Sequence, residues 1–431
     1  MDIISLEAHV LHYLFRSNRL SAREIAEAFI ARIADKNVTL KCFTAYDPDL
    51  IIDQAMKIDA EKSRLGWRPL AGVPFAAKDV LDTFEYPTAY GSSIYHGFQP
   101  ASDAGCIRTA KDNGAILLGK VATGEFATQT PSRARNPRRL SHTPGGSSSG
   151  SASAVGAHMA SVAFGTQTTA SVVRPAVFCG LVGYKPTYGL LGTAGMKSLS
   201  HTQDTIGIIT RSVRDASFFT FGLFDSEMVK RPLKNPKIAV CYSRQWDYLD
   251  DQMVNAIDIA LEQLTDEGAS VTRIRLPDTL EYLSTQQARL FQFEARQNLA
   301  HEFHGHHAEL SERLRLRLDG APSISLDEYL GLRRAVLQAQ MQFQDIISGF
   351  DCILYPAARG EAPEGLENAG DPRFGAIWSV LQVPSISFPI ADGATGLPLG
   401  IQAVGRFGND PQLLKAAMYI TDAISYSRTE S

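Results

Sequence analysis

Apolar residues recur along the chain at helical spacing in some segments and as short continuous runs in others. Near the N-terminus, Ser21 and Glu24 form a capping box, and Ile25, Phe29 and Ile33 follow three to four residues apart. This pattern predicts a helix that begins directly after Ser21.

The same reasoning places further elements along the whole chain. Helices are predicted at about 103–113, 253–266, 325–348 and from 411, and strands at 115–121, 237–242, 353–355, 385–390 and 399–404. Strands that alternate with helices indicate a layered α/β sheet. Residues 225–236 could mark a soft boundary, but no clean linker or repeat is present, and we favour one large domain.

Residues 122–175 break this alternation. They are poor in acidic residues and rich in Gly, Ser, Thr, Pro and Arg, and residues 145–153 have the composition of a flexible linker. However, the small apolar residues 154–165 follow directly, which is typical of a tightly packed buried segment. We interpret 122–175 as loops and a buried helix around a site.

Composition and charge exclude several classes of protein. The 431 residues are 44% hydrophobic and 20% charged, as in an ordinary globular protein, and the net charge of −4 argues against a nucleic-acid partner. No apolar run is long enough to span a membrane, and the N-terminal residues do not form a secretion signal. The five cysteines are odd in number and widely spaced, which indicates reduced thiols and a cytoplasmic location.

Three local patterns suggest other chemistry, and each lacks a necessary part. Four histidines lie within residues 301–307, but they do not form H-E-x-x-H and no acidic or cysteine ligand cluster accompanies them. Residues 145–150 have the glycine spacing of a phosphate-binding loop, but Ser151 stands where lysine is needed. Ser148 centres a G-x-S-x-G match, yet the polar, proline-broken segment 135–144 precedes it instead of a hydrophobic strand.

Three ordered segments resemble the amidase signature family. They are G-V-P-F-A-A-K-D at 72–79, G-G-S-S-S-G-S at 145–151 and G-T-Q-T-T-A-S-V-V-R-P-A at 165–176. Ser147 and Ser171 are 24 residues apart, which is the family spacing without a gap. The resemblance continues at 179–189, 204–216, 351–358 and 383–406, so it covers about residues 5–425.

The resemblance implies a Ser–Ser–Lys site for amide hydrolysis. Ser171 would be the nucleophile, Ser147 the bridging serine and Lys78 the base. A lysine acts as a base only when neutral, and burial after the apolar residues 73–77 should lower its pKa.

The resemblance also assigns supporting groups around these three side chains. The Gly146–Ser147 peptide would be cis, and Thr166 would support the bridging serine. The oxyanion hole would consist of the backbone N–H groups of Thr168, Thr169, Ala170 and Ser171.

Two departures from the family pattern affect the expected activity. Many members have Gly-Gly-Ser where this chain has Thr169-Ala170-Ser171, and the larger residues could narrow the oxyanion hole, which would either tune the size of the substrate or disable the site. Many members also pair an aspartate with an arginine two residues after the nucleophile. Here Gln167 and Arg174 replace them, as in small amidases such as malonamidase, where the shifted arginine holds a substrate carboxylate. Arg174 would therefore bind a carboxylate or carbonyl of a small substrate, unless it is a structural arginine.

The sequence thus predicts one α/β/α domain, residues 1–431, with a central mixed sheet and a motif core at about 70–216. The expected activity is hydrolysis of a small carboxamide through an acyl-enzyme, with no metal or cofactor. Two alternatives stay open: an amidotransferase A-type subunit that generates ammonia from glutamine, although the chain looks short for it, and a catalytically impaired binding protein. A homodimer is possible, because symmetric dimers are the commonest oligomers.

Overall fold

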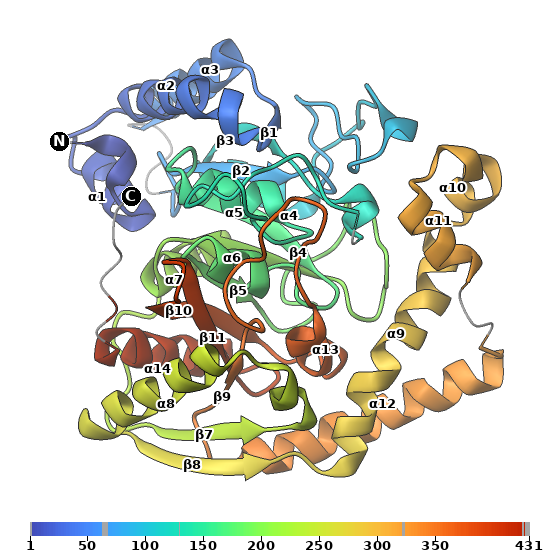
Figure 1. Ribbon diagram of the computed structural model, residues 1–431. Coiled ribbons are helices and arrows are strands. Elements are labelled where there is room, and N and C mark those ends of the chain that lie inside the picture. Colours follow the sequence, from blue (N-terminus) through green and yellow to red (C-terminus); the bar gives the residue numbers. More distant parts are fainter. Residues whose placement is uncertain (1, 63–67, 129, 321–323, 425, 427–431) are drawn as a thin grey trace.

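One mixed sheet organises the molecule (Figure 1). The computed structural model describes residues 2–62, 68–128, 130–320, 324–424 and 426. Over these residues the strand order is β1-β3-β2-β4-β6-β5-β10-β11-β9-β7-β8. The strands are β1 (Phe43–Ala45), β2 (Pro74–Lys78), β3 (Ile116–Val121), β4 (Val162–Gln167), β5 (Val182–Lys185), β6 (Thr205–Thr210), β7 (Lys237–Tyr242), β8 (Ser270–Arg275), β9 (Cys352–Pro356), β10 (Ser385–Asp392) and β11 (Pro398–Val404).

Helices cover both faces of this sheet, as expected for an α/β/α fold. Adjacent strand residues alternate between two hydrophobic cores: Ala76 packs with α2, α3 and α5, whereas Phe75 and Ala77 pack with α4 and α7. The helices are α1 (Ala8–Arg16), α2 (Ala22–Leu40), α3 (Pro48–Glu61), α4 (Gly105–Asp112), α5 (Ser149–Gly156), α6 (Val173–Phe178), α7 (Val213–Leu223), α8 (Asp251–Asp266), α9 (Asp278–Asn298), α10 (Ala300–Gly305), α11 (Glu312–Asp319), α12 (Leu326–Ile347), α13 (Arg373–Val380) and α14 (Asp410–Ala423).

Most predicted elements are confirmed, and the differences have simple causes. Capping boxes start α2 at Ser21 and α12 at Ser325, as predicted. Strand β4 was not predicted, because both of its faces are buried and its small apolar residues show no alternation. The sheet continues on both sides of residues 225–236, so these residues do not divide it.

A helical arm, which we define as α9 to α12 (residues 278–320 and 324–347), extends along one side of the molecule (Figure 1). In it, α9 packs against both α12 and α13. No helix in the described residues has the length and apolarity needed to cross a membrane. All five cysteines are buried and free, which agrees with the predicted reduced thiols.

Candidate active site

Lys78 is the last residue of β2 and lies at the centre of the motif core. All five residues of β2 are buried, and Lys78 has no exposed surface. Its Nζ lies 2.8 Å from Ser147 Oγ and 2.8 Å from Thr166 Oγ1, and it also donates to the Thr166 carbonyl oxygen at 3.3 Å. The Thr166 hydroxyl therefore contacts the lysine directly, and among the described residues no hydrogen bond joins it to Ser147.

Burial gives Lys78 the electrostatics of a base. Loss of water contact lowers its pKa to about 7, although the negative charge of Asp204 opposes this shift. Asp204 is itself buried and accepts hydrogen bonds from Thr168 Oγ1 at 2.5 Å and from the backbone N–H groups of Leu199 and Ser200 at 2.7 and 2.8 Å. A large fraction of Lys78 is consequently neutral near pH 7, which proton abstraction requires.

The bridging-serine segment and the nucleophile segment lie side by side. The Gly146–Ser147 peptide is cis, as the resemblance implies. The Ser147 carbonyl accepts from Gly124 N at 3.3 Å, and Ser148 N donates to the Ser171 carbonyl at 3.3 Å. Residues far apart in the sequence thus meet at the start of two helices, α5 and α6.

Ser148 does not have the geometry of a nucleophile elbow. It is fully buried, and its hydroxyl donates to the Thr166 carbonyl at 3.3 Å. The segment before it, residues 135–144, is a loop with one isolated bridge and no strand. The turn between strand and helix that would expose an elbow serine is therefore missing here.

Thr168 to Ser171, which we call the nucleophile loop, connects β4 to α6. Within the described residues, the backbone N–H groups of Thr169, Ala170 and Ser171 donate to no protein acceptor. Ser171 and Thr169 are partly exposed, whereas Ala170 is buried. Free N–H groups at a partly exposed loop can stabilise a developing oxyanion.

The backbone accommodates Thr169 and Ala170 in place of glycine. Neither residue has a positive φ, so neither position requires glycine. Space is instead provided by Gly375 of α13, where a Cβ would lie 2.3 Å from the Thr169 carbonyl oxygen and 2.8 Å from Ala170 Cβ. The same carbonyl accepts a hydrogen bond from Ser379 Oγ at 2.9 Å.

Gln167 replaces the family aspartate with a different set of contacts. Its Oε1 accepts hydrogen bonds from the backbone N–H groups of Val172 and Val173, at 3.0 and 3.1 Å. Its Nε2 donates to Ser379 Oγ at 3.3 Å. The side chain therefore caps the N-terminus of α6 without needing a charge partner.

Arg174 is almost completely buried beside the bridging-serine loop. One of its amino groups donates to the Gly146 carbonyl oxygen at 2.6 Å. Its Nε and Nη1 are buried and have no hydrogen-bond partner among the described residues. Burial lowers its pKa to about 10, and the charge of Asp371 opposes the shift. Two donors of the guanidinium fork therefore remain for another group.

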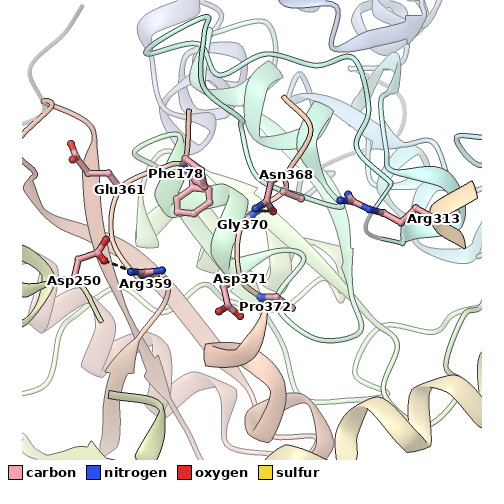
Figure 2. Close-up of a pocket in the computed structure, with 11 residues that line it drawn as sticks. Phe178, Asp250, Arg313, Arg359, Glu361, Asn368, Gly370, Asp371 and Pro372 are labelled. Carbon is pink, nitrogen blue, oxygen red and sulfur yellow. Dashed lines mark hydrogen bonds and ion pairs between the residues drawn. The ribbon is translucent and has the colours of Figure 1, made fainter. Parts of the chain in front are cut away.

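Figure 2 shows a polar pocket of about 590 Å³ between Phe178 and the segment that precedes α13. Residues 368–372 line it, and a Cβ at Gly370 would lie 3.2 Å from Arg174 Cδ. Arg313 and Arg359 point into the same region, and Arg359 pairs with Asp250 at 2.9 Å. The lining therefore carries both charge signs.

Several residues at this site were not found from the sequence. Asp204 lies inside the 204–216 segment that carries the resemblance, so a signal was present. Ser379 and Gln287 come from α13 and α9, and nothing in the local pattern of either helix marks them. Ser379 and Gln287 are recognised as part of the site only from their hydrogen bonds to Thr169 in the nucleophile loop.

Comparison with known proteins agrees with these motifs. Residues 24–414 match the family described as Amidase. The A-type subunit of glutamyl-tRNA(Gln) amidotransferase from Geobacter sp. (strain M21) is 29% identical over 472 aligned positions, which cover 97% of this chain and 97% of that protein. Its counterpart from Microcystis aeruginosa (strain NIES-843 / IAM M-2473) is 29% identical, with 97% and 98% covered.

Solved structures share the whole fold. A crystal structure of an amidase has a TM-score of 0.89 at 26% identity, with 97% of this chain and 100% of that chain covered. The native peptide amidase from Stenotrophomonas maltophilia has a TM-score of 0.85 at 26% identity, with 98% of each chain covered. The family match covers most of the chain, and these structures support it: the chain belongs to the amidase family.

Proposed function

We propose that this protein is an amidohydrolase that cleaves the C–N bond of a small carboxamide through an acyl-enzyme on Ser171. The observation that carries the proposal is the fully buried Lys78, with a pKa of about 7 and its Nζ 2.8 Å from Ser147 Oγ. A buried neutral amine against a serine hydroxyl is a proton acceptor, and a structural lysine would more often be charged and paired.

In the proposed reaction, Ser171 Oγ attacks the amide carbonyl carbon. Its proton passes to Ser147 Oγ, which gives its own proton to Lys78 Nζ. The nucleophile loop N–H groups of Thr168 to Ser171 stabilise the oxyanion. The lysine ammonium returns the proton through Ser147 to the leaving nitrogen as the C–N bond breaks. Water then attacks the ester and releases the acid, which restores the Ser171 hydroxyl.

A small fluorophosphonate tests this proposal without knowledge of the substrate. It phosphonylates an activated serine, and peptide mass mapping identifies the labelled residue. We expect label on Ser171 and none in Lys78→Ala. Label on Ser148 or absence of any label on correctly folded wild-type protein would refute the proposed catalytic residues.

The surroundings of Arg174 favour a substrate that carries a carboxylate or carbonyl group close to the scissile amide. Its two unpaired donors are buried beside the Gly146 carbonyl, one residue from Ser147. A carboxylate or carbonyl oxygen that accepts from Nε or from Nη1 would satisfy a buried donor that the described residues leave unpaired. We therefore expect Arg174→Gln to raise KM for monoamides of short dicarboxylic acids more than for matched uncharged amides. An equal change for both substrate classes would leave Arg174 a structural role only.

The amidotransferase alternative is favoured by one observation, the similarity to the two amidotransferase sequences from Geobacter and Microcystis. Their alignment spans 472 positions against 431 residues here, so this chain lacks segments that those proteins have. Ammonia release from glutamine that appears only with a partner protein would favour the alternative. Turnover of small amides by the purified chain alone would favour the hydrolase.

A further inference from the structure

Thr169 carries a side chain at a position where many family members have none, and this side chain is held from a distant element. Gln287 Nε2, from α9 in the helical arm, donates to Thr169 Oγ1 at 2.9 Å. On the opposite side, Ser379 Oγ of α13 donates to the Thr169 carbonyl at 2.9 Å. The residue before Ala170 and Ser171 is thus fixed at its hydroxyl and at its backbone.

Gln287 is itself held in place, so its contact with Thr169 is directional. It is nearly buried, and its Nε2 also donates to Gln203 Oε1 at 2.9 Å. Gln203 donates to Ser200 Oγ at 3.0 Å, and Ser200 donates to Glu294 at 2.5 Å. Glu294 lies one heptad after Gln287 on the same face of α9, so a connected polar network anchors the amide.

The network continues into the second long helix of the arm. Glu294 is fully buried and accepts hydrogen bonds from Tyr329 OH of α12 at 2.9 Å and from Thr202 Oγ1 at 2.8 Å. Every link is a hydrogen bond between side chains that the fold brings together from separate segments. Gln287 therefore links the arm directly to the Thr169 side chain, and a second route runs from Glu294 through Ser200 to Asp204, which binds the Thr168 hydroxyl of the same loop.

We propose that Thr169 is a positioning residue, held by Gln287, through which the helical arm orients the backbone N–H groups of the nucleophile loop for acylation of Ser171. The inference rests on the proposed function, because it concerns the same acylation step. Backbone N–H groups stabilise an oxyanion only in a narrow geometry, and a displacement of about 1 Å can cost about 100-fold in rate.

Fluorophosphonate labelling of Ser171 measures the effect, because the phosphoryl oxygen takes the place of the oxyanion. Thr169→Val keeps the shape of the side chain and removes the hydroxyl, and Gln287→Met keeps the length and removes the amide. In each variant we expect the maximal labelling rate to fall by about tenfold or more while the half-saturating probe concentration stays within about twofold. Thr169→Ser should restore most of the rate.

The double variant and a matched control separate positioning from loss of stability. If the two residues act as one contact, Thr169→Val/Gln287→Met labels no more slowly than the slower single variant. Thr220→Val removes a buried threonine hydroxyl that donates to the Ala216 carbonyl within α7, outside this network, and should label at the wild-type rate. Thermal unfolding of all variants identifies any that are only destabilised.

The outcomes are distinct for the inference and for the proposed function. Labelled wild-type protein with unchanged rates in Thr169→Val and Gln287→Met would overturn the inference alone. A double variant whose labelling rate falls by the product of the two single-variant losses would also overturn it, because the two residues would then act independently. Absence of label on wild-type Ser171 would overturn the proposed function, and the inference with it.

Discussion

Replacement of Lys78 by methionine should abolish labelling of Ser171. It should also make the protein more stable, relative to wild type, at low pH than at high pH. Lys78 is fully buried, and its pKa is lowered from 10.5 to about 7. Between these two values the folded state binds fewer protons than the unfolded state, so burial of the lysine costs stability as the pH falls. Methionine has a similar length and no charge to desolvate.

The size of the effect follows from proton linkage. With pKa values of 10.5 unfolded and about 7 folded, burial of Lys78 costs about 5 kcal/mol at pH 6 and about 2 kcal/mol at pH 9. The hydrogen bonds from Lys78 to Ser147 and Thr166 are lost at both pH values and largely cancel in the comparison. The stability of Lys78→Met relative to wild type should therefore be higher at pH 6 than at pH 9 by about 2–3 kcal/mol.

Urea unfolding at pH 6 and pH 9 measures this difference, and Lys185→Met is the matched control. Lys185 is also fully buried with a pKa of about 7, but its Nζ donates to the Pro186 and Val383 carbonyls instead of a serine. Both variants should show the same pH-dependent gain in stability. Only Lys78→Met should lose the label on Ser171.

The rate at which wild-type Ser171 is labelled should depend on pH through the same ionisation of Lys78. Because the neutral amine is the base, the rate should rise with an apparent pKa of about 7 and fall about tenfold per pH unit below it. A flat profile between pH 5 and 9, or a relative stability of Lys78→Met that does not change with pH, would refute the assignment of Lys78 as the base.

Three further substitutions test the surroundings of the site. Gly375→Ala places a Cβ about 2.3 Å from a carbonyl oxygen of the nucleophile loop, so it should slow labelling and destabilise the protein by about 1–3 kcal/mol in urea unfolding, whereas Gly331→Ala, with no atom within 4 Å, should not. Gln167→Leu leaves two backbone N–H groups of α6 without an acceptor and should cost about 2–4 kcal/mol; an unchanged unfolding midpoint would show that the cap is dispensable. Lys120→Met removes the buried partner of Asp79, 3.5 Å away, and should cost about 3–5 kcal/mol; a variant more stable than wild type would show that this ion pair does not stabilise the fold.

Local sequence patterns were sufficient to identify the family and most of the helices and strands. Capping residues such as Ser21 and Ser325 act within a few residues of the helix they start, so local pattern was sufficient to find α2 and α12. The spacing of Lys78, Ser147 and Ser171 likewise lies in the chain order, and it identified the motif core before any contact was known.

How the larger residues of the nucleophile loop are accommodated could be learned only from the tertiary structure. The backbone at positions 169 and 170 has no positive φ, so neither position requires glycine. The space for the Thr169 carbonyl and the Ala170 methyl group comes from Gly375, which is more than 200 residues further along the chain. Such a compensation has no local signal, because it depends on how α13 packs against the loop.

The electrostatics of the site depend on packing in the same way. A lysine after an apolar run suggests burial, but the neutral amine requires complete exclusion of water by β3, β4 and the bridging-serine loop. Asp204, Gln287 and Ser379 reach the nucleophile loop from three separate segments. Residue types and their spacing can be taken directly from the sequence. Desolvation and hydrogen-bond geometry arise only when folding brings distant segments into contact.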